Sequence, residues 1–88
     1  MFENYQEQKA TNLREIETLR FEDAFSAGLT FEQLKSYEGA VASFQHAVKC
    51  EPKHLHALSH LADAYAAAEE PHKALIHYSK ASEIEDGS

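Results

Sequence analysis

Apolar residues recur at spacings of three and four through most of the chain, which is the spacing of one buried stripe on an amphipathic helix. The pattern predicts helices over residues 21–34, 37–50, 53–68 and 71–84, and no segment alternates in the manner of a strand. The residues expected to face inward are, helix by helix, Ala24, Ala27, Gly28, Phe31 and Leu34; Ala40, Val41, Phe44, Ala47 and Val48; Leu55, Leu58, Leu61, Ala62 and Tyr65; and Ala74, Leu75, Tyr78, Ala81 and Ile84.

The expected helix ends follow from a few local signals. Ser36 can cap the second helix through its hydroxyl group. Pro52 can end the second helix and open the third, and Pro71 can open the fourth, because proline is tolerated in a first helical turn.

Residues 1–20 contain two capping-box patterns, Asn4 with Glu7 and Asn12 with Glu15, which indicate an additional N-terminal helix. Nothing between Asn12 and Leu34 breaks a helix, so one long helix over this stretch is an equal possibility.

The chain contains an internal repeat. Residues 21–54 overlie residues 55–88 at an offset of 34, so that Ala40 falls on Ala74 and Phe44 falls on Tyr78. A period of this length is typical of stacked helical hairpins. We therefore expect one domain over residues 1–88, made of an N-terminal helix or cap and two repeats.

The repeated residues resemble the tetratricopeptide repeat (TPR), whose unit is two antiparallel helices with small residues where they cross. The residues that carry the resemblance are Ala24, Ala27, Gly28, Phe31, Ala40, Phe44, Ala47 and Pro52 in the first copy, and Leu58, Leu61, Ala62, Tyr65, Ala74, Tyr78 and Ala81 in the second. The resemblance implies an all-α fragment of a right-handed superhelix. The chain departs from the family pattern by lacking tryptophan, by having Glu69, Glu70 and Pro71 in place of a glycine-containing turn, and by having Asp86 where Pro52 predicts a proline.

The family resemblance also implies a concave groove, lined by the first helix of each pair, that binds a peptide or helix of a partner protein. The matching residues are Glu22, Phe25, Leu29, Glu32, Gln33, His56, Ser59, His60, Asp63 and Ala67. Phe25 and Leu29 could instead be core residues covered by the N-terminal helix. These two residues and His60 also stand where chaperone-docking members of the family carry lysine and asparagine, so the clamp for a C-terminal carboxylate is absent.

The last expected helix has an apolar surface beyond its inward stripe. Ile76 occupies a position that is usually polar in the family, and it follows Leu75 directly. A homodimer that buries Leu75, Ile76 and Ile84 would cover this surface, as would a partner protein that completes the array. Neighbouring side chains could also fold over Ile76.

Composition narrows the range of partners. Eight Lys and Arg residues stand against 15 Asp and Glu residues, which gives a formal net charge of −7. This charge disfavours nucleic acid and anionic membranes, and favours neutral or basic proteins as partners. The N-terminal residues lack a secretory signal pattern, and no stretch has the roughly 20 apolar residues of a membrane span. We therefore expect a cytoplasmic protein.

Two groups of residues could carry chemistry. His56, His60 and Asp63 lie at spacings of four and three on one helical face, where they could hold zinc or simply form a solvated surface. Protonation of the two histidines would make the groove less acidic between about pH 7 and 5.5. Cys50 recurs in phase with Ile84, and we expect it to be a small buried apolar residue rather than a ligand or activated thiol.

No nucleophile with a base, phosphate-binding glycine loop or carboxylate pair is evident, so we expect neither an enzyme nor a bound cofactor. The preferred hypothesis is a non-catalytic protein-interaction module, such as an adaptor, a scaffold or a chaperone-like protein. It would bind its partner through the groove or through the open final helix. The alternatives are a homo-oligomeric assembly unit and a small histidine-rich metal-binding protein.

Overall fold

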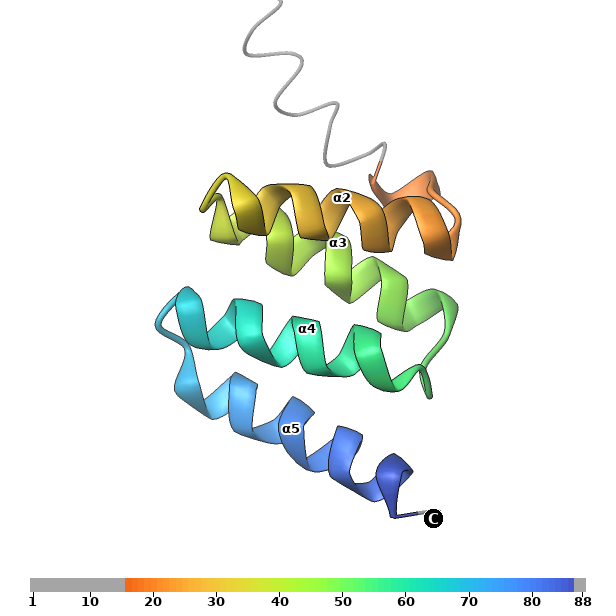
Figure 1. Ribbon diagram of the computed structural model, residues 1–88, viewed down its shortest axis with the longest axis vertical. Helices are drawn as coiled ribbons and strands as arrows, with labels where there is room; N and C mark the ends of the chain where they lie inside the picture. Colours follow the sequence, from red (N-terminus) through yellow and green to blue (C-terminus); the bar gives the residue numbers. More distant parts are fainter. Residues whose placement is uncertain (1–15, 87–88) are drawn as a thin grey trace, which may run out of the picture.

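The computed structural model describes residues 16–86 of the chain (Figure 1). It contains four long helices: α2 (Phe21–Gln33), α3 (Tyr37–Cys50), α4 (Leu55–Ala67) and α5 (Pro71–Glu85). They are stacked in chain order, and each runs antiparallel to the one before it (Figure 1). Over residues 16–86 there is no strand, so the expectation of an all-α fold of antiparallel helical hairpins is confirmed.

The helix boundaries match the expected ones closely except at the start of α4. Pro52 and Lys53 form a turn instead of the first turn of a helix. His54 is the N-cap of α4, and its Nδ1 accepts a hydrogen bond from the backbone N–H of Ala57 at 3.3 Å. Pro52 therefore lies beyond the end of α3 but does not open α4, whereas Pro71 stands in the first turn of α5 as predicted.

From residue 16 onward, the structure decides between a separate N-terminal helix and one long helix that continues to Leu34. Residues 16–18 are helical, Leu19 and Arg20 are not, and α2 begins at Phe21, so a continuous helix up to Leu34 is wrong. The Leu19 carbonyl oxygen lies 2.9 Å from Nε2 of His46, and the Leu19 side chain packs on the core. These contacts stabilise the break. The predicted capping boxes and most of the predicted N-terminal helix lie outside the described residues.

Small residues occupy the helix crossings. The fully or almost fully buried small residues of the predicted stripes are Ala24, Gly28, Ala40, Ala47, Ala62, Ala74 and Ala81. A Cβ atom added to Gly28 would lie 2.5 to 2.7 Å from the ring of Phe44, which is itself completely buried. Glycine at this position therefore allows an aromatic ring to lie directly on the backbone of α2.

The turns inside the two hairpins have the same geometry. Lys35 and Glu69, which correspond to each other in the two repeats, are the two described non-glycine residues with positive φ, at 60° and 65°. In the first turn, Lys35 N–H donates to the Glu32 carbonyl at 3.0 Å and Ser36 N–H to the Phe31 carbonyl at 2.8 Å. The second turn has both bonds at the corresponding positions of the second repeat. Each is a Schellman motif, in which a left-handed residue ends the helix.

Ser36 therefore acts through its backbone, because its side chain makes no capping hydrogen bond. The second turn, which contains Glu69 and Glu70 and precedes Pro71, has the same geometry as the first.

Four residues expected to be buried are exposed. Leu34 is 70% exposed because it is the C-cap of α2, and Cys50 is exposed at the last position of α3. Leu75 and Tyr78 are 65% and 42% exposed because no described helix packs on the outer face of α5. Leu75 and Tyr78 show that a residue on the apolar stripe of a helix is buried only where a neighbouring helix covers it.

Candidate functional site

The ten predicted groove residues lie on α2 and α4, and they divide equally by exposure. Those that are exposed are Glu22, Gln33, His56, Asp63 and Ala67; those that are partly buried are Phe25, Leu29, Glu32, Ser59 and His60. The structure brings the two helices into contact through three of the partly buried residues. The Phe25 and His60 rings meet edge to face with centroids 5.3 Å apart, and His60 Nδ1 lies 3.5 Å from Glu32 Oε1.

Phe25 is the centre of an aromatic cluster that spans α2, α3 and α4. Its ring stacks on Phe21 at 5.8 Å and meets the edge of the Phe44 ring at 5.7 Å. His60 also stacks on Phe44, at 5.3 Å, and Phe21 lies 4.5 Å from His54. Phe25 is therefore both an extension of the core and a partly open surface, and this combination suits an apolar anchor from a partner.

His60 has one polar atom without a full hydrogen bond. Its Nδ1 is buried, and the nearby Glu32 carboxylate does not meet the geometry of a hydrogen bond. A buried polar atom of this kind costs free energy unless a small movement brings it into register with an acceptor. A small movement of either side chain would therefore complete a hydrogen bond between Glu32 of α2 and His60 of α4.

The three residues considered as zinc ligands do not converge. His60 packs on Phe25 and Phe44, Asp63 accepts a hydrogen bond from the Tyr78 hydroxyl, and the ring of His56 lies 6.0 Å from that of His54. Over residues 16–86 no group of three or more His, Cys, Asp or Glu residues could hold a metal ion. The metal-binding hypothesis therefore has no ligand set in this part of the chain.

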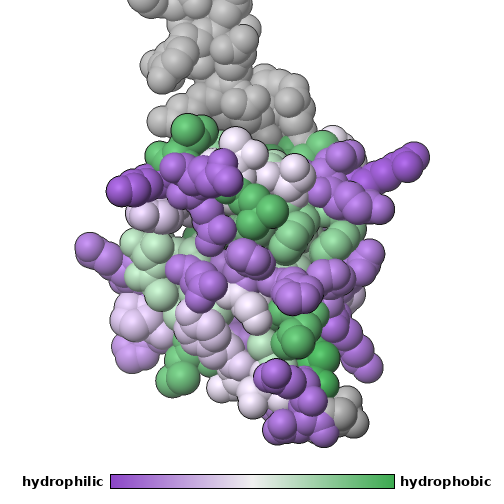
Figure 2. Space-filling view, viewed as in Figure 1, coloured by the Kyte–Doolittle hydropathy of each residue, from purple (hydrophilic) through white to green (hydrophobic). Residues whose placement is uncertain are grey.

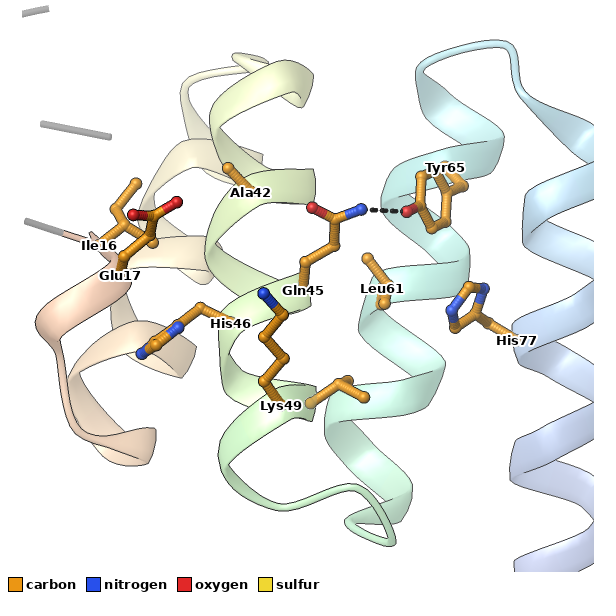
Figure 3. A pocket seen from close by; sticks show the side chains of 10 residues that line it. Ile16, Glu17, Ala42, Gln45, His46, Lys49, Leu61, Tyr65 and His77 are labelled. Atoms are coloured by element: carbon orange, nitrogen blue, oxygen red, sulfur yellow. Dashed lines mark hydrogen bonds between the residues drawn. The ribbon is translucent and has the colours of Figure 1, made fainter. Parts of the chain in front are cut away.

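Sequence reasoning missed a hollow of about 500 Å³ on the side of the molecule formed by α3 and α5 (Figure 3). Leu61 and Tyr65 of α4 line it together with side chains from α3, and His77 lines it from α5. The Gln45 side chain of α3 donates a hydrogen bond to the Tyr65 hydroxyl across the hollow. A signal was present, because Ala42, Gln45 and Lys49 lie at helical spacing on one face of α3.

The polar groups of this hollow are largely engaged within the chain. Gln45 bonds Tyr65, Nε2 of His46 lies 2.9 Å from the Leu19 carbonyl oxygen, and Nδ1 of His77 lies 2.9 Å from the Lys73 carbonyl oxygen. The polar side chains that remain on the lining are those of Glu17 and Lys49, which carry opposite charges. We therefore treat the hollow as a groove between stacked helices.

The outer face of α5 is the third surface of interest. Ile76 is 53% exposed and follows the exposed Leu75. In the space-filling view, hydrophobic surface reaches the lower end of the molecule, where α5 lies, among hydrophilic side chains (Figure 2). Of the three residues proposed for an oligomer interface, the third, Ile84, is partly buried.

Two interactions of α5 affect ionisation, and the first of them joins α5 to α4. The Tyr78 hydroxyl donates a hydrogen bond to Oδ1 of Asp63, which raises the pKa of Tyr78, with smaller contributions from desolvation and from the carboxylate charge. Lys73 Nζ lies 2.9 Å from Glu70 Oε1, and this hydrogen bond, together with the charge of Glu70, raises the pKa of Lys73. Lys73 Nζ also lies 5.6 Å from the centroid of the Tyr65 ring.

Comparison of the chain with protein-family models, with curated proteins and with solved structures finds no match. None of the helices over residues 16–86 is long and apolar enough to cross a membrane.

Proposed function

We propose that the protein is a non-catalytic interaction module of the TPR type, which binds a segment of a partner protein on the face shared by α2 and α4. The observation that carries this proposal is the contact of Phe25 with His60, because it joins the two helices through a partly open aromatic surface. The turns inside the two hairpins have the same geometry at corresponding positions, and this supports the proposal that the hairpins are two units of a superhelical repeat array.

The charges around this surface favour one kind of partner. Glu22, Glu32 and Asp63 contribute three carboxylates, and none of the ten groove residues is a lysine or arginine. We therefore propose a neutral or basic segment with an apolar side chain that packs on Phe25. Since acidic segments would be repelled, docking of an acidic chaperone tail is disfavoured. The exposed free thiol of Cys50 suits a reducing compartment such as the cytoplasm.

The test is a quantitative pull-down with two variants of equal charge change. Glu22→Lys with Glu32→Lys reverses the charges of the proposed face, whereas Glu38→Lys with Glu51→Lys changes the net charge by the same amount on and just beyond α3. The first variant should lose the proteins that the wild type binds directly, and the second should retain them. Equal capture by both variants, with unchanged circular dichroism, would place the binding surface elsewhere.

A more local variant tests the apolar part of the surface. Phe25→Leu keeps an apolar side chain in the core but removes the ring that contacts His60. We expect weaker binding of the same partner, with most of the thermal stability kept. Unchanged affinity for that partner would exclude Phe25 as its anchor.

A further inference from the structure

His60 of α4 lies at the junction of the two hairpins. Its ring stacks on Phe44 of α3, with centroids 5.3 Å apart, and meets the Phe25 ring of α2 edge to face. Its Nδ1 atom is buried without a hydrogen bond, and Oε1 of Glu32 on α2 lies 3.5 Å from it. Glu32 is therefore the charged group that faces His60 from the first hairpin. The Glu32 side chain is 26% exposed, so a bound partner can also reach it.

A hydrogen bond between these two side chains depends on a proton at Nδ1 of His60. An ionised carboxylate only accepts hydrogen bonds, so Glu32 can pair with Nδ1 only when this nitrogen carries hydrogen. A neutral imidazole carries hydrogen on one of its two nitrogens, whereas an imidazolium carries hydrogen on both. Protonation therefore makes Nδ1 a charged donor beside the carboxylate, which gives a stronger bond than a neutral donor. The positive charge also lies on the ring of Phe44, whose face attracts cations.

The other titratable groups around His60 are engaged elsewhere or lie farther along their helices. They are His56 and Asp63 on α4, Glu22 on α2, and Tyr78 on α5. Asp63 accepts a hydrogen bond from the Tyr78 hydroxyl, and the ring of His56 lies 6.0 Å from that of His54. Glu22 stands near the start of α2, about 15 Å from Glu32 along the helix axis. From α3, the side chain that packs on His60 is Phe44, which has no titratable group.

We propose that His60 is a proton switch for partner binding on the face shared by α2 and α4, an inference that rests on the proposed function. At neutral pH the Glu32 carboxylate is available to a basic side chain of the partner. In acid, the His60 imidazolium binds Glu32, cancels its charge and joins α2 to α4. Because histidine changes its charge between about pH 5 and pH 8, acidification releases the partner.

Release of a captured partner tests the switch. The probe is the protein that immobilised wild type captures directly in the pull-down, and its affinity is measured at about pH 7.5 and about pH 5.5. The affinity of the wild type should be about fivefold lower at the lower pH, which is the effect of one partly exposed ion pair. His60→Phe and His60→Gln do not titrate at this position and should bind equally at both pH values.

The matched control is His56→Gln, which removes an exposed histidine one turn earlier on α4. This variant should keep the pH dependence of the wild type. Binding by the wild type that does not change with pH overturns the proposal. The same pH dependence in the wild type and in both His60 variants also overturns it, because the effect would then come from other groups.

A double-mutant cycle tests the link between the hairpins without a partner. Glu32→Gln and His60→Phe, singly and together, are unfolded in urea at about pH 5.5 and about pH 8. The coupling between the two residues should change the unfolding equilibrium constant about fivefold at the lower pH and much less at the higher one. Equal coupling at both pH values overturns the switch. Coupling that depends on pH in a protein that captures no direct partner would contradict the proposed function but not the link, so the two failures are distinguishable.

Discussion

The hairpin of α2 and α3 and the hairpin of α4 and α5 share a turn geometry and a set of small crossing residues, yet they differ in the burial of the corresponding residues Phe44 and Tyr78. Phe44 is completely buried, whereas the corresponding Tyr78 is 42% exposed. One reason is local: a Cβ atom at Gly28 would overlap the Phe44 ring, and the corresponding residue of the second hairpin, Ala62, carries this Cβ atom. The other is that α3 lies between α2 and α4, whereas α5 packs on α4 alone among the described helices.

The comparison teaches that a repeated sequence pattern can determine the geometry of each hairpin without determining the burial of each residue. Burial depends on which elements lie on both sides of a helix. In this respect α3 is an inner helix, and α5 is an end helix with an open face. Four experiments test this difference, and we describe them from the largest expected effect to the smallest.

Removal of the two equivalent rings should have very different effects on stability. Phe44→Ala should lower the free energy of unfolding by about 3 to 5 kcal/mol, because it leaves a cavity in the core. Tyr78→Ala should lower it by about 1 kcal/mol, since an exposed ring and one hydrogen bond are lost. Urea denaturation followed by circular dichroism measures both values. Similar losses in the two variants would contradict the distinction between the inner helix α3 and the end helix α5.

Substitution of Gly28 by the alanine that stands at the corresponding position of the second hairpin should show why the two rings differ in burial. Gly28→Ala should cost about 1 to 3 kcal/mol, because the new methyl group overlaps the buried ring of Phe44. Combination with Phe44→Leu should recover part of this loss, since the double variant removes the overlap. A double-mutant cycle by urea denaturation measures the coupling. A purely additive result would mean that the ring of Phe44 moves without cost.

The two matched turns should respond equally to glycine. Lys35→Gly and Glu69→Gly should each raise the free energy of unfolding by about 0.5 to 1 kcal/mol, because glycine adopts positive φ without the strain of a side chain. The measurement is again urea denaturation, with Lys53→Gly as a control at an exposed loop residue for which no positive φ is recorded. A large difference between the two turns would show that they are not equivalent in energy.

The smallest effect concerns the hydrogen bond of Tyr78 with Asp63. The pKa of Tyr78 is raised in the folded protein, so this contribution to stability is complete below the ordinary tyrosine pKa of about 10. It is lost as the pH rises through the folded value. Spectrophotometric titration should therefore show a late-ionising tyrosine that disappears in Tyr78→Phe and remains in Tyr37→Phe. If the ionisation at high pH persists in Tyr78→Phe, the tyrosine with the raised pKa is another residue.

The arrangement of the helices was largely predictable from the sequence, because the signals for it are local. The apolar stripes predict the four helices, and Pro71 marks the start of α5. The start of α4 was not predicted, since Pro52 is compatible with both a turn and a first helical turn, and the His54 cap favours the turn. The break at Leu19 depends on His46, which lies 27 residues away.

The candidate site was only partly predictable. Periodicity placed Phe25 and His60 on the first helices of the two hairpins, but not at the 5.3 Å separation of their rings. The participation of Phe21 and His54 was missed, as was the hollow beside Gln45, because both depend on how neighbouring helices cross. The exposure of Cys50 shows the same limit, since neither its periodicity with Ile84 nor the predicted end of α3 at this residue reveals whether a neighbouring element covers it.

The direct packing of Phe44 on Gly28 has a consequence for building longer arrays from this unit. An engineer who extends the chain by copying residues 21–54 would carry along a glycine and a ring that already fit between two neighbouring helices. Copies of residues 55–88 would instead place the ring of Tyr78 inside an array, opposite the methyl group of Ala62, with a polar hydroxyl to satisfy. The first repeat is therefore the module suited to elongation, and the second is suited to the end of the array.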